Sequence, residues 1–204
     1  MRWLRLYLRA RRVPLALAGT VCATGSLWAS WPYFSDGQTV NARVVSVAAL
    51  IAAVAVGTTL GGADDALDHT ASVNWPARRA GHVLLAAAAI VALLLASTLT
   101  DVRFEPLGVV ARNTAGLLGL TALGAALLGA ALSWIAPLTW TLVAMLPWLG
   151  PSDQVRLQVG AWLVQPAGTT AATVCATVLA VVGLVAYALR GCPRRPAAET
   201  APDR

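Results

Sequence analysis

The stretch Leu84-Leu-Ala-Ala-Ala-Ala-Ile-Val-Ala-Leu-Leu-Leu95 contains no polar side chain. It lies within an apolar segment, residues 81–100, that has about the 20 residues a transmembrane helix requires. Five further apolar stretches, each bounded by charged residues or by Pro and Gly, occur elsewhere in the chain: residues 13–33, 44–61, 113–133, 135–149 and 169–189. In chain order, the fifth of the six stretches, 135–149, is the weakest because it is short and bracketed by Pro137 and Pro147.

The overall composition agrees with this pattern. Of the 204 residues, 58% are hydrophobic and 12% are charged, against about 25% charged in an ordinary soluble domain. The mean hydropathy is +0.69. Such a composition excludes a soluble globular enzyme and a disordered chain, and three cysteines without paired spacing exclude a disulfide scaffold. The sequence predicts an all-α, polytopic integral membrane protein with six transmembrane helices.

The arginines predict the orientation. If both termini are inside, the outer segments hold Arg43, Arg103, Arg112 and Arg156, and the other eleven of the 15 basic residues are inside. We therefore expect a multi-pass protein of the cell (cytoplasmic) membrane with both termini in the cytoplasm. The first stretch is too long for a signal-peptide core, so we expect an uncleaved first helix. We expect one transmembrane domain over 1–190 and a disordered tail over 191–204. This charge distribution argues against nucleic acid as a partner.

Small residues are dense in the fourth stretch. One set recurs at every fourth position, and a second set runs beside it: Thr121, Ala125 and Gly129, then Ala122, Ala126 and Ala130. This spacing favours close helix packing in lipid. The alternative interpretation is simply an alanine-rich membrane protein.

Catalytic chemistry is missing from the apolar stretches. His82 and Arg112 lie at the edges of the third and fourth, where a residue at the membrane interface is the favoured interpretation. No serine-nucleophile, zinc-protease or phosphate-loop motif occurs. We therefore expect no catalytic residue, metal site or cofactor, and no ATP hydrolysis by this chain.

Three segments outside the apolar stretches carry the remaining information. Residues 1–12 predict a helix in the inner membrane interface, or simply a positive flank of the first span. The expected inner-interface residues there are Arg2, Trp3, Arg5, Tyr7, Arg9, Arg11 and Arg12.

The second segment, residues 62–80, is longer than a helix connection requires. It predicts a short cytoplasmic helix over 63–73, ended by Asn74-Trp75-Pro76, with a solvated loop as the alternative. Arg78 and Arg79 then anchor the start of the third span at the inner surface.

The third segment, residues 151–168, is too short and polar to span a membrane and too apolar for a free loop. It predicts a re-entrant or interfacial outer element. Trp162 and Leu163 are expected to be shielded in it, with Asp153 and Arg156 in water.

With these parts placed, residues 1–190 resemble the membrane subunit of an ABC-2-type ABC exporter, in a small permease form common in actinobacteria. The resemblance is carried by the order of the segments and by three motifs: Asp65-Ala66-Leu67-Asp68-His69-Thr70-Ala71, Pro76-Ala77-Arg78-Arg79 and Arg112-Asn113-Thr114-Ala115-Gly116-Leu117. It implies six spans, an N-terminal interfacial helix, a cytoplasmic coupling helix in 62–80 and a re-entrant outer segment.

The resemblance also implies partners. Two permease subunits, as a homodimer or heterodimer in the lipid bilayer, would flank a substrate path above two cytosolic ABC ATPase subunits. The residues expected to couple to the ATPase are Asp64, Asp65, Leu67, Asp68, His69 and Trp75. Two other classes stay open: a non-transporting membrane scaffold or accessory subunit, and a membrane enzyme, which the missing catalytic groups disfavour.

Overall fold

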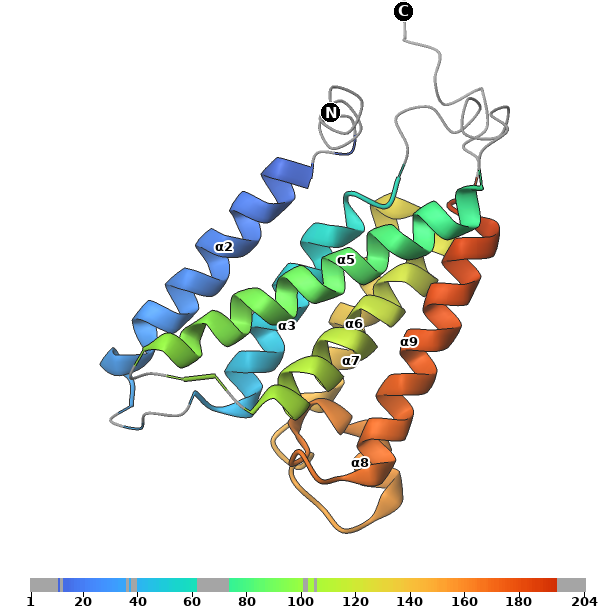
Figure 1. Ribbon diagram of the computed structural model, residues 1–204. Coiled ribbons are helices and arrows are strands. Elements are labelled where there is room, and N and C mark those ends of the chain that lie inside the picture. The colour runs from blue at the N-terminus through green and yellow to red at the C-terminus, as the bar shows by residue number, and fades with distance from the viewer. Residues whose placement is uncertain are drawn as a thin grey trace, which may run out of the picture.

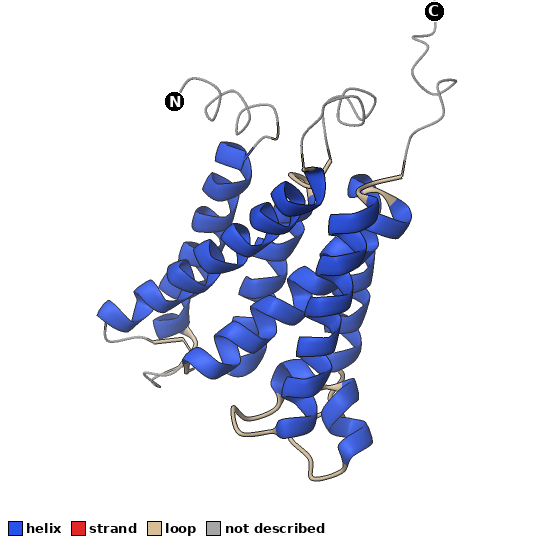
Figure 2. Cartoon of the chain, turned by 45° about the vertical axis from the view of Figure 1, so that its right-hand side comes forward, coloured by secondary structure: helices blue, strands red, loops and turns tan. Residues whose placement is uncertain are grey.

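The computed structural model describes residues 11, 13–35, 37, 40–61, 74–100, 103–104 and 106–193. These residues form helices and connecting turns and contain no strand (Figure 2). The helices are α2 (Val13–Ser30), α3 (Ala42–Gly57), α5 (Trp75–Leu95), α6 (Leu107–Leu128), α7 (Ile135–Ala144), α8 (Val155–Gly160) and α9 (Thr170–Arg190). Short 3-10 helical turns accompany them: η1 (Trp31–Tyr33), η2 (Ala96–Leu99), η3 (Ala130–Leu132) and η4 (Trp162–Val164).

Four helices are long and apolar enough to cross a membrane: Val13–Tyr33, Trp75–Leu99, Leu107–Leu128 and Thr170–Arg190. They contain 21, 25, 22 and 21 residues. At 1.5 Å per residue, each exceeds the roughly 30 Å of the bilayer hydrocarbon core. The helices α3 and α7 are shorter, with 16 and 10 residues. The chain is thus an all-helical protein with four membrane-length helices, where the sequence predicted six spans.

Two helices begin earlier than the sequence predicted. The third apolar stretch was expected to start at residue 81, but α5 begins at Trp75, where the Asn74 side chain accepts a hydrogen bond from the Ala77 amide. Asn74-Trp75-Pro76 therefore starts a helix, since Pro is well tolerated in a first turn. The short helix expected over 63–73 lies outside the described residues. Likewise α6 begins at Leu107 and not at residue 113.

The chain runs back and forth between two ends of the bundle (Figure 1). We call one end the Arg11 end, because Arg11 contacts the backbone of Leu60 there, and the other the Trp31 end. The helices α2, α5 and α7 run away from the Arg11 end, and α3, α6 and α9 run toward it. The start of α2 and the end of α9 thus lie at the same end.

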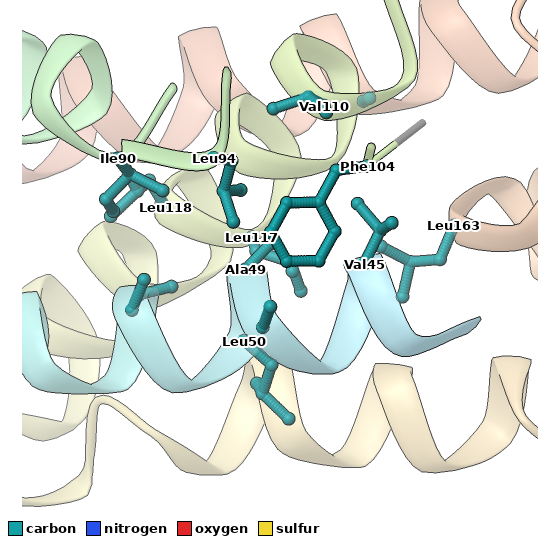
Figure 3. Packing of buried hydrophobic residues seen from close by; sticks show 14 of the residues in the cluster. Val45, Ala49, Leu50, Ile90, Leu94, Phe104, Val110, Leu117, Leu118 and Leu163 are labelled. Atoms are coloured by element: carbon teal, nitrogen blue, oxygen red, sulfur yellow. The ribbon is translucent and has the colours of Figure 1, made fainter. Parts of the chain in front are cut away.

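The core is built around α6. A cluster of buried apolar side chains joins α6 to α3 and α5, with Phe104 and Leu163 closing it near the Trp31 end (Figure 3). Of the residues in the membrane-length window of α6, 83% are buried, against 11% for α2, 22% for α5 and 28% for α9. The helix α6 is therefore the interior wall of the bundle, and the other three present most of their surface outward.

The closest helix contact joins α6 to α9. A Cβ atom on Gly183 would overlap the backbone carbonyl of Gly119, and one on Gly119 would overlap the backbone of Leu179 and Ala180. Only glycine on both helices allows this backbone-to-backbone approach.

The predicted packing pattern on α6 is only partly used for packing. Thr121, Ala122, Ala125 and Ala126 are buried as the spacing suggested. Gly129 instead ends the helix with a φ of 88°, and no neighbouring atom lies within 4 Å of the place of its absent Cβ. The closest approach lies at Gly119, outside the four-residue series read from the sequence.

We expect Gly183→Ala to lower the stability of the bundle by about 1–3 kcal/mol, because the added methyl meets backbone that cannot rotate away. The matched control is Gly81→Ala on α5, where the added Cβ meets no atom within 4 Å. That change should be neutral or stabilising by up to about 1 kcal/mol. Thermal unfolding in detergent, followed by tryptophan fluorescence, compares them, and equal midpoints would contradict the contact.

Cysteine labelling tests the orientation. In a background without the three native cysteines, Glu105→Cys and Asp153→Cys should react with a membrane-impermeant maleimide in intact cells, and Arg78→Cys only after permeabilisation, because the arginine distribution places residue 78 inside. Labelling of position 105 only from the cytoplasmic side would overturn the predicted topology.

Candidate functional site: an apolar groove with a polar end

Three side chains from two parts of the chain contact the backbone carbonyl of Leu60 at the Arg11 end. Arg11 donates to the carbonyls of Thr59 and Leu60, both at 3.4 Å. The Tyr187 hydroxyl donates to Leu60 O at 2.6 Å, and Cys192 Sγ lies 3.7 Å from the same oxygen. Carbonyls just past a helix end lack helical partners, so these donors satisfy the end of α3. They also tie the start of α2 and the end of α9 to it.

Arg79 closes the same end from α5. Its side chain is 9% exposed, and its guanidinium lies where a Cβ on Gly191 would sit. Gly191 follows α9 with a φ of 67°, a left-handed conformation that glycine adopts without strain. A cation at a helix C-terminus is favourable because of the helix dipole. The predicted anchor Arg79 thus packs against the end of α9.

An apolar groove of about 490 Å³ separates α2 from α5. The helix α2 packs against α3, while the start of α5 lies across the bundle beside Gly191, so α2 and α5 diverge toward the Arg11 end (Figure 1). The groove is lined by Val13, Ala16, Leu17, Thr20 and Val21 of α2, by Val56 and Thr59, and by His82, Leu85, Ala86, Ala89, Ile90 and Leu93 of α5.

The groove continues toward the Trp31 end. A second section of about 240 Å³ shares Val21 and Leu93 with the first and ends between Trp28, Ser97 and Phe104. Together the two sections follow α2 over most of its length. We call them the α2–α5 groove.

Polar groups gather at one part of this groove, close to the Arg11 end. The Thr59 hydroxyl lies 2.8 Å from His82 Nε2, and it also donates to Val56 O at 2.7 Å. Thr20 donates its hydroxyl to Ala16 O at 2.8 Å. Arg11 lies beside the Thr59–His82 pair, because its guanidinium donates to the Thr59 carbonyl. An apolar cavity with a few convergent polar groups is the usual form of a small-ligand site.

A buried polar network occupies the opposite end. Arg112, 5% exposed, donates to Gln165 O at 2.6 Å and to Pro166 O at 2.9 Å. Its neighbour Asn113 donates to Leu163 O at 2.8 Å and to Ser46 Oγ at 3.0 Å. This network fixes the segment after η4 to α6 and α3. Arg112 is therefore buried by protein.

The indole of Trp162 packs on Gly116 of α6. A Cβ on Gly116 would overlap the Trp162 ring, so only glycine at this position leaves room for the ring. Trp162 and Leu163 are fully buried, and Asp153 and Arg156 are exposed. The exposure pattern is the one expected for the outer segment, and its cause within the described structure is packing of Trp162 and Leu163 against the protein.

Most of the predicted coupling residues lie outside the described residues. These coupling residues are Asp64, Asp65, Leu67, Asp68 and His69. Most of the expected inner-interface residues also lie outside the described part of the chain: Arg2, Trp3, Arg5, Tyr7, Arg9 and Arg12. Trp75 is described as the first residue of α5, and the Arg78 guanidinium lies 5.9 Å from the centre of its ring. Trp75 and Arg78 therefore belong to the membrane-length helix itself.

Sequence reasoning missed the groove and the partners of its polar end. His82 and Thr59 are 23 positions apart, so their contact leaves no local signal. A hydroxyl inside an apolar run, such as Thr20, was the one available hint. Among the described residues, no group of three or more His, Cys, Asp or Glu side chains could hold a metal ion.

No protein-family model, curated protein or solved structure matches this chain.

We expect Arg112→Met to loosen the segment that follows η4. The substitution keeps the apolar stem but leaves the Gln165 and Pro166 carbonyls without their donors, at about 1–3 kcal/mol for a buried unsatisfied group. Hydrogen exchange should accelerate at residues 161–168. Arg156→Met on the exposed face of α8 is the matched control and should change nothing. Equal exchange in both variants would contradict a bracing role for Arg112.

Proposed function

We propose that this chain is the membrane-spanning permease subunit of an ATP-driven ABC exporter, which forms the substrate path and couples it to a separate cytosolic ATPase subunit. One observation carries most weight. Gly61 and Asn74, which bracket the acidic segment 62–73, lie at the Arg11 end together with the start of α2 and the end of α9. A partner acting on that segment would act directly on the ends of α3 and α5.

In this proposal α3 and α7 complete six spans. Ten residues of α7 cover only about 15 Å, so the turns on either side supply the rest of that pass. Irregular backbone at membrane depth is tolerated where protein buries it. Pro137, Thr141 and Ala144 of α7 are buried, which fits this requirement. The proposal also keeps residues 1–12 as an inner interfacial helix and α8 with η4 as the outer re-entrant element.

The contacts at the Arg11 end offer a route for coupling. Leu60, just before the acidic segment, is bonded to Tyr187 of α9, and Arg79, just after it, packs on Gly191. A push on segment 62–73 by closing ATPase subunits would reach α9 from both sides. ATP chemistry would come from the partner, since this sequence has no phosphate loop. A second permease subunit would complete the path in the bilayer.

Charge reversal tests the proposal. Asp68→Arg, alone and with Asp65→Arg, should weaken co-purification of the ATPase or uncouple its ATP turnover from transport, while membrane insertion stays normal. Reversing a charge in a docked pair costs about 2–5 kcal/mol, against about 0–1 kcal/mol for a solvated surface charge.

Asp153→Arg is the matched control, because this exposed carboxylate precedes α8, which lies at the Trp31 end (Figure 1). It should leave association and turnover unchanged. If the double variant at 65 and 68 behaves like this control, segment 62–73 is not the coupling element. An ATPase that co-purifies but turns over identically with and without this chain would instead favour the scaffold.

A further inference from the structure

The α2–α5 groove has the dimensions of a chain-like ligand. The main section and its extension hold about 490 and 240 Å³ and follow α2 from Val13 to Trp28, which is the elongated shape of an extended apolar chain. Leu17, Val21, Ala86, Ala89 and Leu93 give the groove apolar walls. A water molecule finds few hydrogen-bond partners in such a space.

We propose that the α2–α5 groove binds one acyl chain of an anionic membrane phospholipid, with the headgroup at the Arg11 end. This inference goes beyond the proposed function and needs no ATPase partner. The groove runs along α2 between the two ends of the bundle, as a lipid chain runs between headgroup and midplane. Its exposed rim, including Leu17 and Leu85, opens it to the surrounding lipid.

The polar end supplies selectivity. Apolar walls alone distinguish poorly between one lipid chain and another, because the bilayer is equally apolar. Thr59 and His82 line the groove near the Arg11 end, where hydrogen-bonding groups of a headgroup or its ester linkage would lie.

The charge at this end is complementary to a phosphate. Arg11, Arg78, Arg79 and Arg190 carry positive charge there, and these four arginines outnumber the three aspartates of the neighbouring segment 62–73. Basic residues near an anionic leaflet attract its lipids.

Photocrosslinking tests the site. The protein is placed in phosphatidylcholine nanodiscs with a phosphatidylglycerol that carries a diazirine on one acyl chain, and crosslinked peptides are identified by mass spectrometry. We expect crosslinks on the groove faces of α2 and α5. The variant Ala86→Phe with Ala89→Phe fills the groove and should lose these crosslinks.

The matched control places the same two rings elsewhere on α5. Ala88→Phe with Ala92→Phe adds them at exposed positions that do not line the groove, and it should crosslink like the wild type. Both variants are first compared with the wild type by size exclusion. If only the groove variant fails to fold, single Ala89→Phe, at an exposed position, replaces it.

Competition separates the headgroup from the chain. Unlabelled phosphatidylglycerol should displace the probe, and phosphatidylcholine should not. Equal displacement by both lipids would contradict the proposed selectivity for an anionic headgroup. Crosslinks spread evenly over the exposed faces of α2, α5 and α9 overturn the groove as a site, since they mark boundary lipid only. A disulfide between two copies carrying Ala89→Cys would overturn the lipid in favour of a second chain.

Discussion

The backbone contact between Gly119 and Gly183 is the constraint on which the rest of the bundle depends. Lipid tails are as apolar as leucine, so helices in a bilayer associate through close packing and hydrogen bonds instead of hydrophobic exclusion. Two glycines let α6 and α9 approach until their backbones touch, so that many atoms of the two helices come into van der Waals contact. With α9 on one side of α6 and α3 and α5 on others, α6 becomes the buried wall, and the remaining helices take positions around it.

The α2–α5 groove follows from that arrangement. At the Arg11 end, α5 is held across the bundle because Arg79 packs on Gly191 after α9. The helix α2 is held on the other side, because Arg11 bonds to the carbonyls that follow α3. These two attachments pull the neighbouring helices toward different partners, and no described side chain fills the space between them. The groove is therefore a consequence of how the ends are fixed.

Hydropathy predicted the long helices well. A chain that crosses lipid must satisfy its backbone polar groups within a helix over its whole length, so each span needs a long apolar run. The predicted last stretch, 169–189, differs from α9 (Thr170–Arg190) by one residue at each end. The starts of α5 and α6 were missed because arginines in their first two turns were read as boundaries. A guanidinium can lie inside a helical segment when carbonyls are within reach, as Arg112 shows. The fit of Trp162 on Gly116 and the Thr59–His82 contact join distant positions, so composition and spacing held no sign of them.

The same physical device acts at both ends of the bundle. At one end Arg11 bonds to the carbonyls after α3, and at the other Arg112 bonds to those after η4. Irregular backbone at the edge of a membrane leaves carbonyls without partners, and a guanidinium with five donors satisfies several of them at once. These bonds keep the ends in one arrangement while most of the surface of α2 faces outward. The polar end of the groove is thus fixed by hydrogen bonds and its length is open to the outside of the bundle, which is the geometry that the proposed lipid site requires.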